Sequence, residues 1–407
     1  MPVPSRPQLI SLSAVLLLLL ASSVIFAQHD GGGVTGGGMI GGTTERSTKP
    51  ATRSILKPTG RTTTTTSTVK RRGTTGRRST AASPARTTTL SADAYYQQGE
   101  ALYNAKNYKE ALDAYLKATQ INPSMKDALY RMGWIYNDLE DYASAIDPLK
   151  RVISLQPDNA AAHFELGYAY RKLERYTEAL PVFLETVRLK PDYAGAHYEI
   201  GWIYNEQKNY DAAIRSLRTA ISYRADYPDA QNELGYALRN LNRNPEAIQA
   251  YNDAIRLKPD MGLAYLGLGD VYYYNTKQYA EAVKAYQVGT ELRPNNATAL
   301  YNLGWCYNDL QRYTQAIDVL RKAVGVRSQY PEAYNEMGYA LHQLGRYGEA
   351  VQQYLVAIRQ KTGYASAIYN LGMSYIALNN RSAAQEQYRI LQRIDPARAT
   401  KLFNSIK

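Results

Sequence analysis

The sequence predicts an all-α protein of stacked helical hairpins, and three periodic features support this prediction. A glycine recurs every 34 residues, with one interval of 35, and a period of this length is typical of a helical repeat. The glycines are Gly99, Gly133, Gly167, Gly201, Gly235, Gly269, Gly304, Gly338 and Gly372. An alanine lies twelve residues after each glycine, or thirteen in one repeat, from Ala111 to Ala384. A proline such as Pro157 or Pro191 closes most repeats.

Each period is expected to fold as two helices that pack against each other. The glycine and the alanine fall in two successive helical patterns, and small side chains there let the paired helices approach closely. The closing proline ends the second helix, because it cannot donate the backbone hydrogen bond that would continue it. In two of the three repeats without this proline, Pro228 and Pro331 open the following helix, where a missing N–H costs little.

The spacing, the glycine, the alanine and the closing proline together resemble the tetratricopeptide repeat family. Nine units match, over about residues 92–398. The resemblance implies a right-handed superhelical solenoid whose first helices line a concave wall, with a continuous core where neighbouring hairpins stack. Residues 399–407 are expected to cap the last repeat. The family is used as a binding scaffold in many unrelated settings, so the resemblance alone names no partner.

Residues 1–27 have the composition of a secretory signal peptide. One basic residue, Arg6, precedes an uncharged apolar run from Leu9 to Ala27, and Ala27 is a small residue at a position typical of cleavage. We therefore expect an exported protein, periplasmic or extracellular. An uncleaved membrane anchor is the alternative, because nineteen uncharged residues are just long enough to span a bilayer. The single cysteine, Cys306, leaves no intramolecular disulfide to support the fold.

Residues 28–91 form a Gly/Thr/Arg-rich linker with eleven Lys or Arg residues against two acidic residues. The linker carries a net charge of +9 out of the chain's +12, so the repeats are nearly neutral. Its apolar content is too low to offset the entropy lost on ordering, and we expect a disordered, extended tether. The alternative is that its basic residues bind an anionic polymer or a membrane surface. Nucleic acid is not favoured, because no aromatic residues interleave with the basic ones.

Two sets of positions in each first helix, counted from the glycine of the repeat, differ in chemistry. Offsets −4, −1 and +3 are apolar, as in Leu129, Met132 and Tyr136, and are expected to form the core. Offsets −3, +1 and +4 hold aromatic, asparagine and arginine residues, and by analogy with the family they line the concave wall. The predicted partner-binding groove consists of Tyr130, Trp134, Asn137, Phe164, Tyr168, Arg171, Tyr198, Trp202, Asn205, Tyr236, Arg239, Tyr301, Trp305, Asn308 and Tyr339.

The groove positions alternate between two kinds of repeat. Repeats that have tryptophan and asparagine (GWIYN, GWCYN) alternate with repeats that have tyrosine and either arginine or histidine (GYAYR, GYALH). The groove positions therefore have a period of two repeats. An extended ligand in regularly spaced pockets would fit this period. The alternative is that some of these groove residues pack between adjacent first helices. The chain has 37 tyrosines against 4 phenylalanines, which favours a partly hydrated surface, because a tyrosine ring can be buried while its hydroxyl stays in water. Glutamates at offset −2, such as Glu165 and Glu233, are interpreted either as acceptors in the groove or as a solvated face.

The sequence contains no motif for catalysis, cofactor binding or metal coordination. His163 and His197 share an offset in adjacent repeats, but no third ligand lies in register, so no metal site is predicted. We therefore expect a non-enzymatic scaffold of the cell envelope that needs no cofactor and binds a protein or peptide partner along the groove. Two alternatives stay open. One is a protein that binds an envelope polymer, either glycan or anionic, and the other is a scaffold subunit of a secretion or surface-assembly complex.

Overall fold

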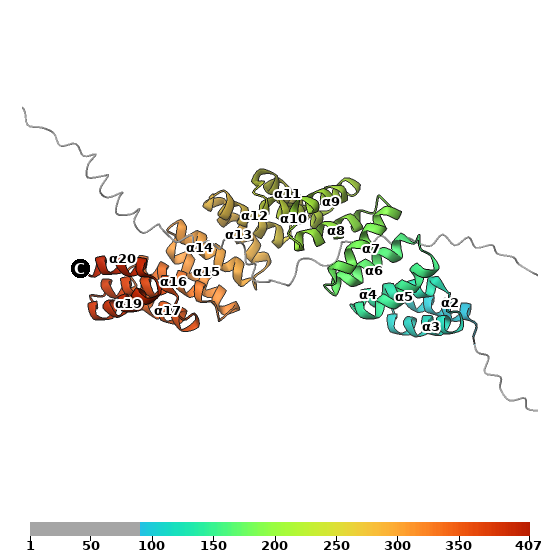
Figure 1. The fold of residues 1–407 in the computed structure, drawn as a ribbon, viewed down its shortest axis with the longest axis horizontal. Helices are drawn as coiled ribbons and strands as arrows, with labels where there is room; N and C mark the ends of the chain where they lie inside the picture. Colours follow the sequence, from blue (N-terminus) through green and yellow to red (C-terminus); the bar gives the residue numbers. More distant parts are fainter. Residues whose placement is uncertain (1–89) are drawn as a thin grey trace, which may run out of the picture. The chain divides into compact units, whose positions relative to one another are not determined.

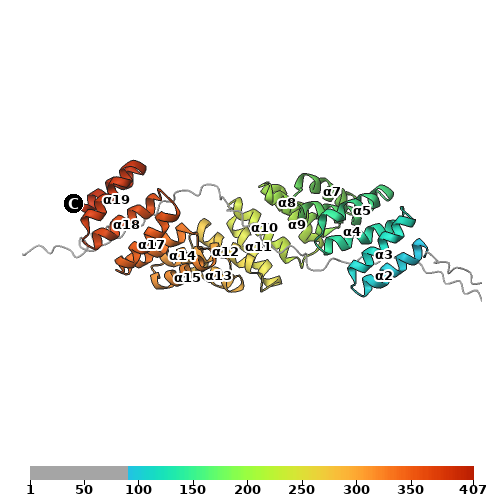
Figure 2. The ribbon, with the colours of Figure 1, turned by 90° about the horizontal axis from the view of Figure 1, so that it is seen from below.

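The computed structural model describes residues 90–407 of the chain. The predicted signal peptide and almost all of the predicted linker lie outside these residues. Within the described part, all regular structure is helical, and the helices pair into nine consecutive hairpins followed by one further helix. Figures 1 and 2 show the hairpins following one another in chain order. The prediction of an all-α solenoid of helix-turn-helix repeats is therefore confirmed.

The first helix of each hairpin carries the repeat's glycine. These helices are α2 (Ala92–Asn104), α4 (Lys126–Asp138), α6 (Ala160–Lys172), α8 (Ala194–Glu206), α10 (Pro228–Asn240), α12 (Gly262–Asp270), α14 (Ala297–Asp309), α16 (Pro331–Gln343) and α18 (Ala365–Ala377). A short π-helix, η1 (Val271–Asn275), continues α12. Side chains cap several of these helices, as where Asn159 Oδ1 accepts from the backbone N–H of Ala162 at 3.0 Å.

The second helix of each hairpin carries the alanine. These helices are α3 (Tyr108–Ile121), α5 (Tyr142–Leu155), α7 (Tyr176–Leu189), α9 (Tyr210–Tyr223), α11 (Asn244–Leu257), α13 (Tyr279–Leu292), α15 (Tyr313–Val326), α17 (Tyr347–Gln360) and α19 (Arg381–Ile394). The turn between the paired helices always contains one residue with positive φ. That residue is a glycine in one repeat, Gly345, and Lys, Glu, Asn or Gln in the other eight.

The glycine is required because the paired helices meet at it. A Cβ added to Gly201 would lie 2.6 Å from Cγ of Leu217, and one added to Gly99 would lie 2.6 Å from the ring of Tyr115. Leu217 and Tyr115 are fully buried, as are the alanines at the second small position. Each hairpin therefore has its own contact point, and the remaining apolar surface is buried against the next hairpin.

The single 35-residue interval is accommodated by η1. The backbone N–H of Thr276 donates to the carbonyl of Val271 five residues earlier, at 3.1 Å, which is the pairing of a π-turn. A π-turn absorbs one extra residue without changing the helices on either side of it. The insertion therefore changes the surface of the sixth first helix and leaves the packing of Ala282, which is fully buried, intact.

The last helix, α20 (Pro396–Ile406), packs on the ninth hairpin. A Cβ added to Gly372 would lie 2.6 Å from Leu402, so a side chain of α20 makes the contact at the glycine that a second-helix side chain makes in earlier repeats. Leu402 and Ile406 are buried, whereas Phe403 is 38% exposed.

Candidate interaction face of the first helices

The predicted groove residues form three rows along the first helices, which we name by their offset from the glycine. In the −3 row, Phe164, Tyr198 and Tyr301 each pack against a tyrosine of the loop before the next repeat. Ring centroids are 4.8 Å apart for Phe164 and Tyr193 and 5.0 Å apart for Tyr198 and Tyr227. Phe164 and Tyr198 are buried, and Tyr130 and Tyr301 of the same row are half-buried. The −3 row therefore offers little area to a ligand.

The +1 row is the most accessible of the three. Its members are Trp134, Tyr168, Trp202, Tyr236, Trp305 and Tyr339, and all except the buried Tyr168 are half-buried. Each ring contacts an aromatic ring of the preceding repeat, with centroids between 5.5 and 6.2 Å apart. Several of these partners, such as Tyr176 and Tyr210, are the first residue of a second helix. The +1 row is thus a partly accessible series of rings, each held in place from one side by a ring of the preceding repeat.

The +4 row lies in the joints between repeats. Asn137, Asn205 and Asn308 are buried, and each donates from Nδ2 to the glutamate at offset −2 of the next repeat. Asn205 Nδ2 donates both to the backbone carbonyl of Glu233, at 3.1 Å, and to its Oε2, at 3.0 Å. The same double contact joins Asn137 to Glu165 and Asn308 to Glu336. These asparagine side chains therefore hold adjacent repeats together.

The glutamates at offset −2 are neither groove acceptors nor a solvated face. Glu165, Glu199, Glu233 and Glu336 are all buried. Glu199 pairs with Arg171 of the preceding repeat at 2.5 Å, and both side chains are buried. Burial disfavours the charged guanidinium, but the Glu199 carboxylate and nearby tyrosines outweigh it and raise the pKa of Arg171. Burial without a partner would be costly, so the pairing explains why these charges stay in the joint.

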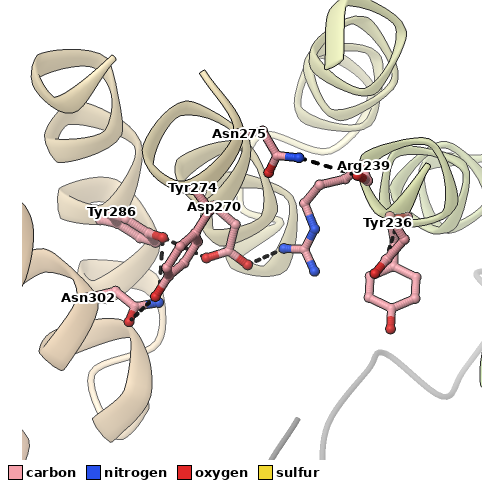
Figure 3. Close-up of polar contacts among 8 residues, drawn as sticks. Tyr236, Arg239, Asp270, Tyr274, Asn275, Tyr286 and Asn302 are labelled. Atoms are coloured by element: carbon pink, nitrogen blue, oxygen red, sulfur yellow. Dashed lines mark hydrogen bonds and ion pairs between the residues drawn. The ribbon is translucent and has the colours of Figure 1, made fainter. Parts of the chain in front are cut away.

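The joint around η1 uses a different set of groups, which Figure 3 shows. Offset −2 of this repeat is Gly267, and a Cβ there would meet the Tyr251 ring. Arg239 instead pairs with Asp270, which stands where six of the other repeats have an aromatic residue of the +1 row. The Tyr286 hydroxyl donates to Asp270 at 2.6 Å. Asp270 therefore completes the joint, and the +1 row loses one ring at this repeat.

A Tyr–acid–Arg group also occurs in the first repeat. The Tyr115 hydroxyl donates to Glu100 at 2.6 Å, and Arg131 donates to both carboxylate oxygens at 2.9 and 3.1 Å. Glu100 and Asp270 both follow the glycine of their repeat directly. Wherever the +1 position is acidic, a tyrosine and an arginine thus bind the carboxylate.

Three carboxylates of this face were not among the predicted site residues. Asp138, Glu206 and Asp309 follow directly after the asparagine in the three tryptophan-containing repeats, and all three are exposed. Sequence comparison of the repeats could have found them, because the motif GWxYN is extended by Asp or Glu every time it occurs.

Other chemistry is sparse in the described residues. No three His, Cys, Asp or Glu residues among them are placed to hold a metal ion. Cys306 is buried in the core, and burial raises the pKa of its thiol. Among the helices of residues 90–407, none is both long and apolar enough to cross a membrane.

The sequence profile of the tetratricopeptide repeat matches residues 92–125, 130–194, 198–262, 266–331, 320–365 and 365–398. The chain belongs to the tetratricopeptide repeat family. Three of the matched blocks, 130–194, 198–262 and 266–331, each span about two hairpins of this tetratricopeptide repeat protein.

Solved structures with similar hairpins include YrrB, described as a tetratricopeptide repeat protein with an unusual peptide-binding site. It is 25% identical, with a TM-score of 0.44, and the match covers 47% of this chain and 99% of YrrB. MamA is 26% identical with a TM-score of 0.38, and the match covers 42% of this chain and 94% of MamA. Pseudomonas aeruginosa pilF is 20% identical with a TM-score of 0.45, covering 53% of this chain and 97% of that one. No curated protein sequence matches the chain significantly.

Proposed function

We propose that this protein is a non-enzymatic scaffold that binds an extended segment of a partner protein along the +1 row. The tetratricopeptide repeat architecture supports a role in protein–protein contacts, and the half-buried aromatic row supports this location. Tryptophan and tyrosine suit such a surface, because their rings bury apolar area while the indole N–H or the hydroxyl stays hydrated.

The surroundings of the row support binding by a rigid surface. Each ring is braced by an aromatic of the preceding repeat, as Trp202 is by Tyr176 at 5.7 Å. The buried Asn–Glu and Arg–Glu contacts fix the joint directly behind the row. A surface that is already ordered loses little conformational entropy on binding, so more of the contact energy contributes to affinity.

We further propose that the protein acts in the cell envelope. The support is the apolar run from Leu9 to Ala27 with its single preceding basic residue, Arg6. Fractionation of the native host, with antibody detection of the protein in the periplasmic, membrane and secreted fractions, tests this part separately.

A capture experiment tests the binding proposal. The full chain is compared with a variant carrying Trp134→Ala, Trp202→Ala and Trp305→Ala, using extract of the native host. The matched control removes three exposed apolar side chains from second helices, Leu116→Ala, Leu184→Ala and Val288→Ala. Circular dichroism first establishes that all three chains are helical. We expect partners to be lost only with the tryptophans, and identical partner lists for the three chains would refute the proposal.

A further inference from the structure

Each tryptophan of the +1 row has an exposed carboxylate one helical turn further along. The pairs are Trp134 with Asp138, Trp202 with Glu206, and Trp305 with Asp309. Residues four apart on a helix are neighbours on one face, so ring and carboxylate present themselves to the same side. The tyrosine-containing repeats have Lys172, Asn240 and Gln343 at the corresponding position, so the acid occurs only beside tryptophan.

An aromatic face beside a carboxylate is suited to binding a Lys or Arg side chain. The ring attracts the cation through its quadrupole, tryptophan most strongly, and the carboxylate accepts its N–H groups. The Asp309 carboxylate already accepts from the Tyr273 hydroxyl at 2.6 Å. A carboxylate has about four lone-pair sites, so it can accept from more than one donor at a time.

The protein itself uses this combination for its own arginines. Three guanidinium groups of the first helices each contact an aromatic ring, at 4.7, 4.9 and 5.3 Å from the centroid, and a carboxylate. These groups are Arg131 with Tyr103 and Glu100, Arg171 with Trp202 and Glu199, and Arg239 with Tyr236 and Asp270. The surface pairs place an aromatic ring and a carboxylate where solvent reaches them, and one of these rings, Trp202, is also the ring that Arg171 contacts.

The charges of the chain indicate what would occupy the pairs. The first helices, η1 included, contain thirteen acidic and five basic residues, a net charge of −8. Residues 61–90, which directly precede the first repeat, contain seven Lys or Arg residues and no Asp or Glu. This segment ends next to Ser91, whose side chain caps α2 by accepting from Ala94 N–H at 3.2 Å.

We propose that the three tryptophan–carboxylate pairs bind basic side chains, and that residues 61–90 of the same chain occupy them, beginning at Trp134 and Asp138. This inference rests on the proposed function, because it assigns an occupant to the same face. A basic partner segment would have to displace that occupant. The basic run 70–78 lies 13 to 21 residues before Ser91, and an extended chain of that length spans about 40–70 Å. Trp134 is in the repeat next to α2, where it contacts Tyr103, and α2 is only about 20 Å long. The nearest pair is therefore well within reach.

Tryptophan fluorescence tests the proposal without any partner, because the three tryptophans of the chain are the three of these pairs. Acrylamide quenching is compared between the full chain and a full-length variant whose basic residues are neutralised. The changes are Arg61→Gln, Lys70→Gln, Arg71→Gln, Arg72→Gln, Arg77→Gln, Arg78→Gln and Arg86→Gln. We expect stronger quenching in the neutralised chain, and stronger quenching of the natural chain at high salt, which screens exposed charges. Equal quenching of the two chains at low salt would overturn the proposal.

A titration then locates the contacts. A synthetic peptide of residues 61–90 is added to the neutralised chain, and the change in fluorescence gives a Kd. Removing one carboxylate by Asp138→Asn is expected to raise Kd about 2- to 5-fold, the size of an exposed cation–π or ion-pair contact. The matched control changes three exposed aspartates of second helices, Asp113→Asn, Asp147→Asn and Asp318→Asn. It removes more charge than Asp138→Asn does, but it is expected to change Kd less. Equal effects of the two changes would reduce the interaction to unspecific charge attraction and refute the pairs.

The protein concentration distinguishes binding within one chain from binding between copies. Quenching of the natural chain is expected to stay constant on tenfold dilution. A dilution-dependent change would show that a second copy supplies the segment, which contradicts the proposal. If the peptide does not bind but the tryptophan variant still loses its partners in the capture experiment, the proposed function stands and this inference fails.

Discussion

Replacing Asn205 by alanine should weaken one joint of the solenoid selectively. The Asn205 side chain is 1% exposed and donates from Nδ2 to two oxygens of Glu233, which is 2% exposed. Alanine removes both hydrogen bonds and leaves the glutamate short of donors in a site that water does not reach. Because α8 and α10 belong to neighbouring repeats, the loss falls on the interface between the fourth and fifth hairpins.

The magnitude follows from the two contacts. A hydrogen bond to a charged acceptor contributes about 1.5–3 kcal/mol, and one to a neutral carbonyl about 0.5–1.5 kcal/mol. Oδ1 of Asn205 is buried and accepts no hydrogen bond within the described residues, so its removal adds nothing to the sum. One effect reduces the sum, because alanine favours a helix over asparagine by about 0.7 kcal/mol or less. We therefore expect the free energy of unfolding to fall by about 2–3 kcal/mol.

Urea denaturation followed by far-UV circular dichroism measures the change. Because a repeat protein is stabilised by nearest-neighbour interfaces, a weakened joint should also broaden the transition or divide it in two. Asn252→Ala, at an exposed position of α11, is the control and should stay within about 0.5 kcal/mol of the natural chain. A loss below about 1 kcal/mol for Asn205→Ala, or an equal loss in the control, would refute the assignment of Asn205 to the joint.

A partner substitution separates the pair from its surroundings. If Asn205 acts through Glu233, the double change Asn205→Leu with Glu233→Met should restore much of the stability, because replacing both members of a buried polar pair is often nearly neutral. Additive losses would mean that Glu233 depends mainly on other groups.

Three further predictions concern other parts of the repeats. Gly201→Ala should destabilise the chain by about 1–3 kcal/mol through its clash with Leu217, whereas Gly325→Ala, with no atom within 4 Å, should be neutral or slightly stabilising in the same urea assay. Deleting Tyr274 from η1 restores the 34-residue period, so it should cost less stability than deleting one residue from α8, and equal losses would contradict the role of the π-turn. Burial lowers the pKa of His342 from 6.5, so its contribution to stability should be complete above pH 6.5 and be lost as the pH falls through the lower folded pKa. The variant His342→Gln should reduce the fall in stability at acidic pH. An unchanged fall would refute this role of His342.

The sequence contained the period of the fold but not the surroundings of each row. Gly201 and Ala213 recur at fixed spacing, and that is sufficient to predict the hairpin and its stacking. The turns within hairpins gave no signal, because Lys208 and its equivalents adopt positive φ without being glycine. Offsets +1 and +4 looked alike in the sequence, since both fall on one face of a single helix. Only packing against the next hairpin shows that Trp202 stays half-exposed while Asn205 enters the joint.

A signal for the joints was nevertheless present as a correlation between repeats. Each asparagine at +4 is followed 28 residues later by a glutamate, as Asn137 is by Glu165, and Arg171 is followed by Glu199 at the same distance. A donor at one repeat and an acceptor at the next are what a buried joint requires, because a polar group without a partner is costly there. Within a single repeat the glutamates fit either groove acceptors or a solvated face, because their partners lie in the preceding repeat.

The exception at η1 has a consequence for binding. Gly267 supplies no acceptor, so Arg239 pairs with Asp270. Because Asp270 stands at a +1 position in place of an aromatic residue, the +1 row is divided into two aromatic stretches. One stretch runs from Trp134 to Tyr236 and the other from Trp305 to Tyr339, with a carboxylate between them. In the proposed binding mode, a partner segment that follows the row would pass this carboxylate between the two aromatic stretches. Asp270 accepts from Arg239 and Tyr286, so the interruption of the row and the joint of this repeat depend on the same carboxylate.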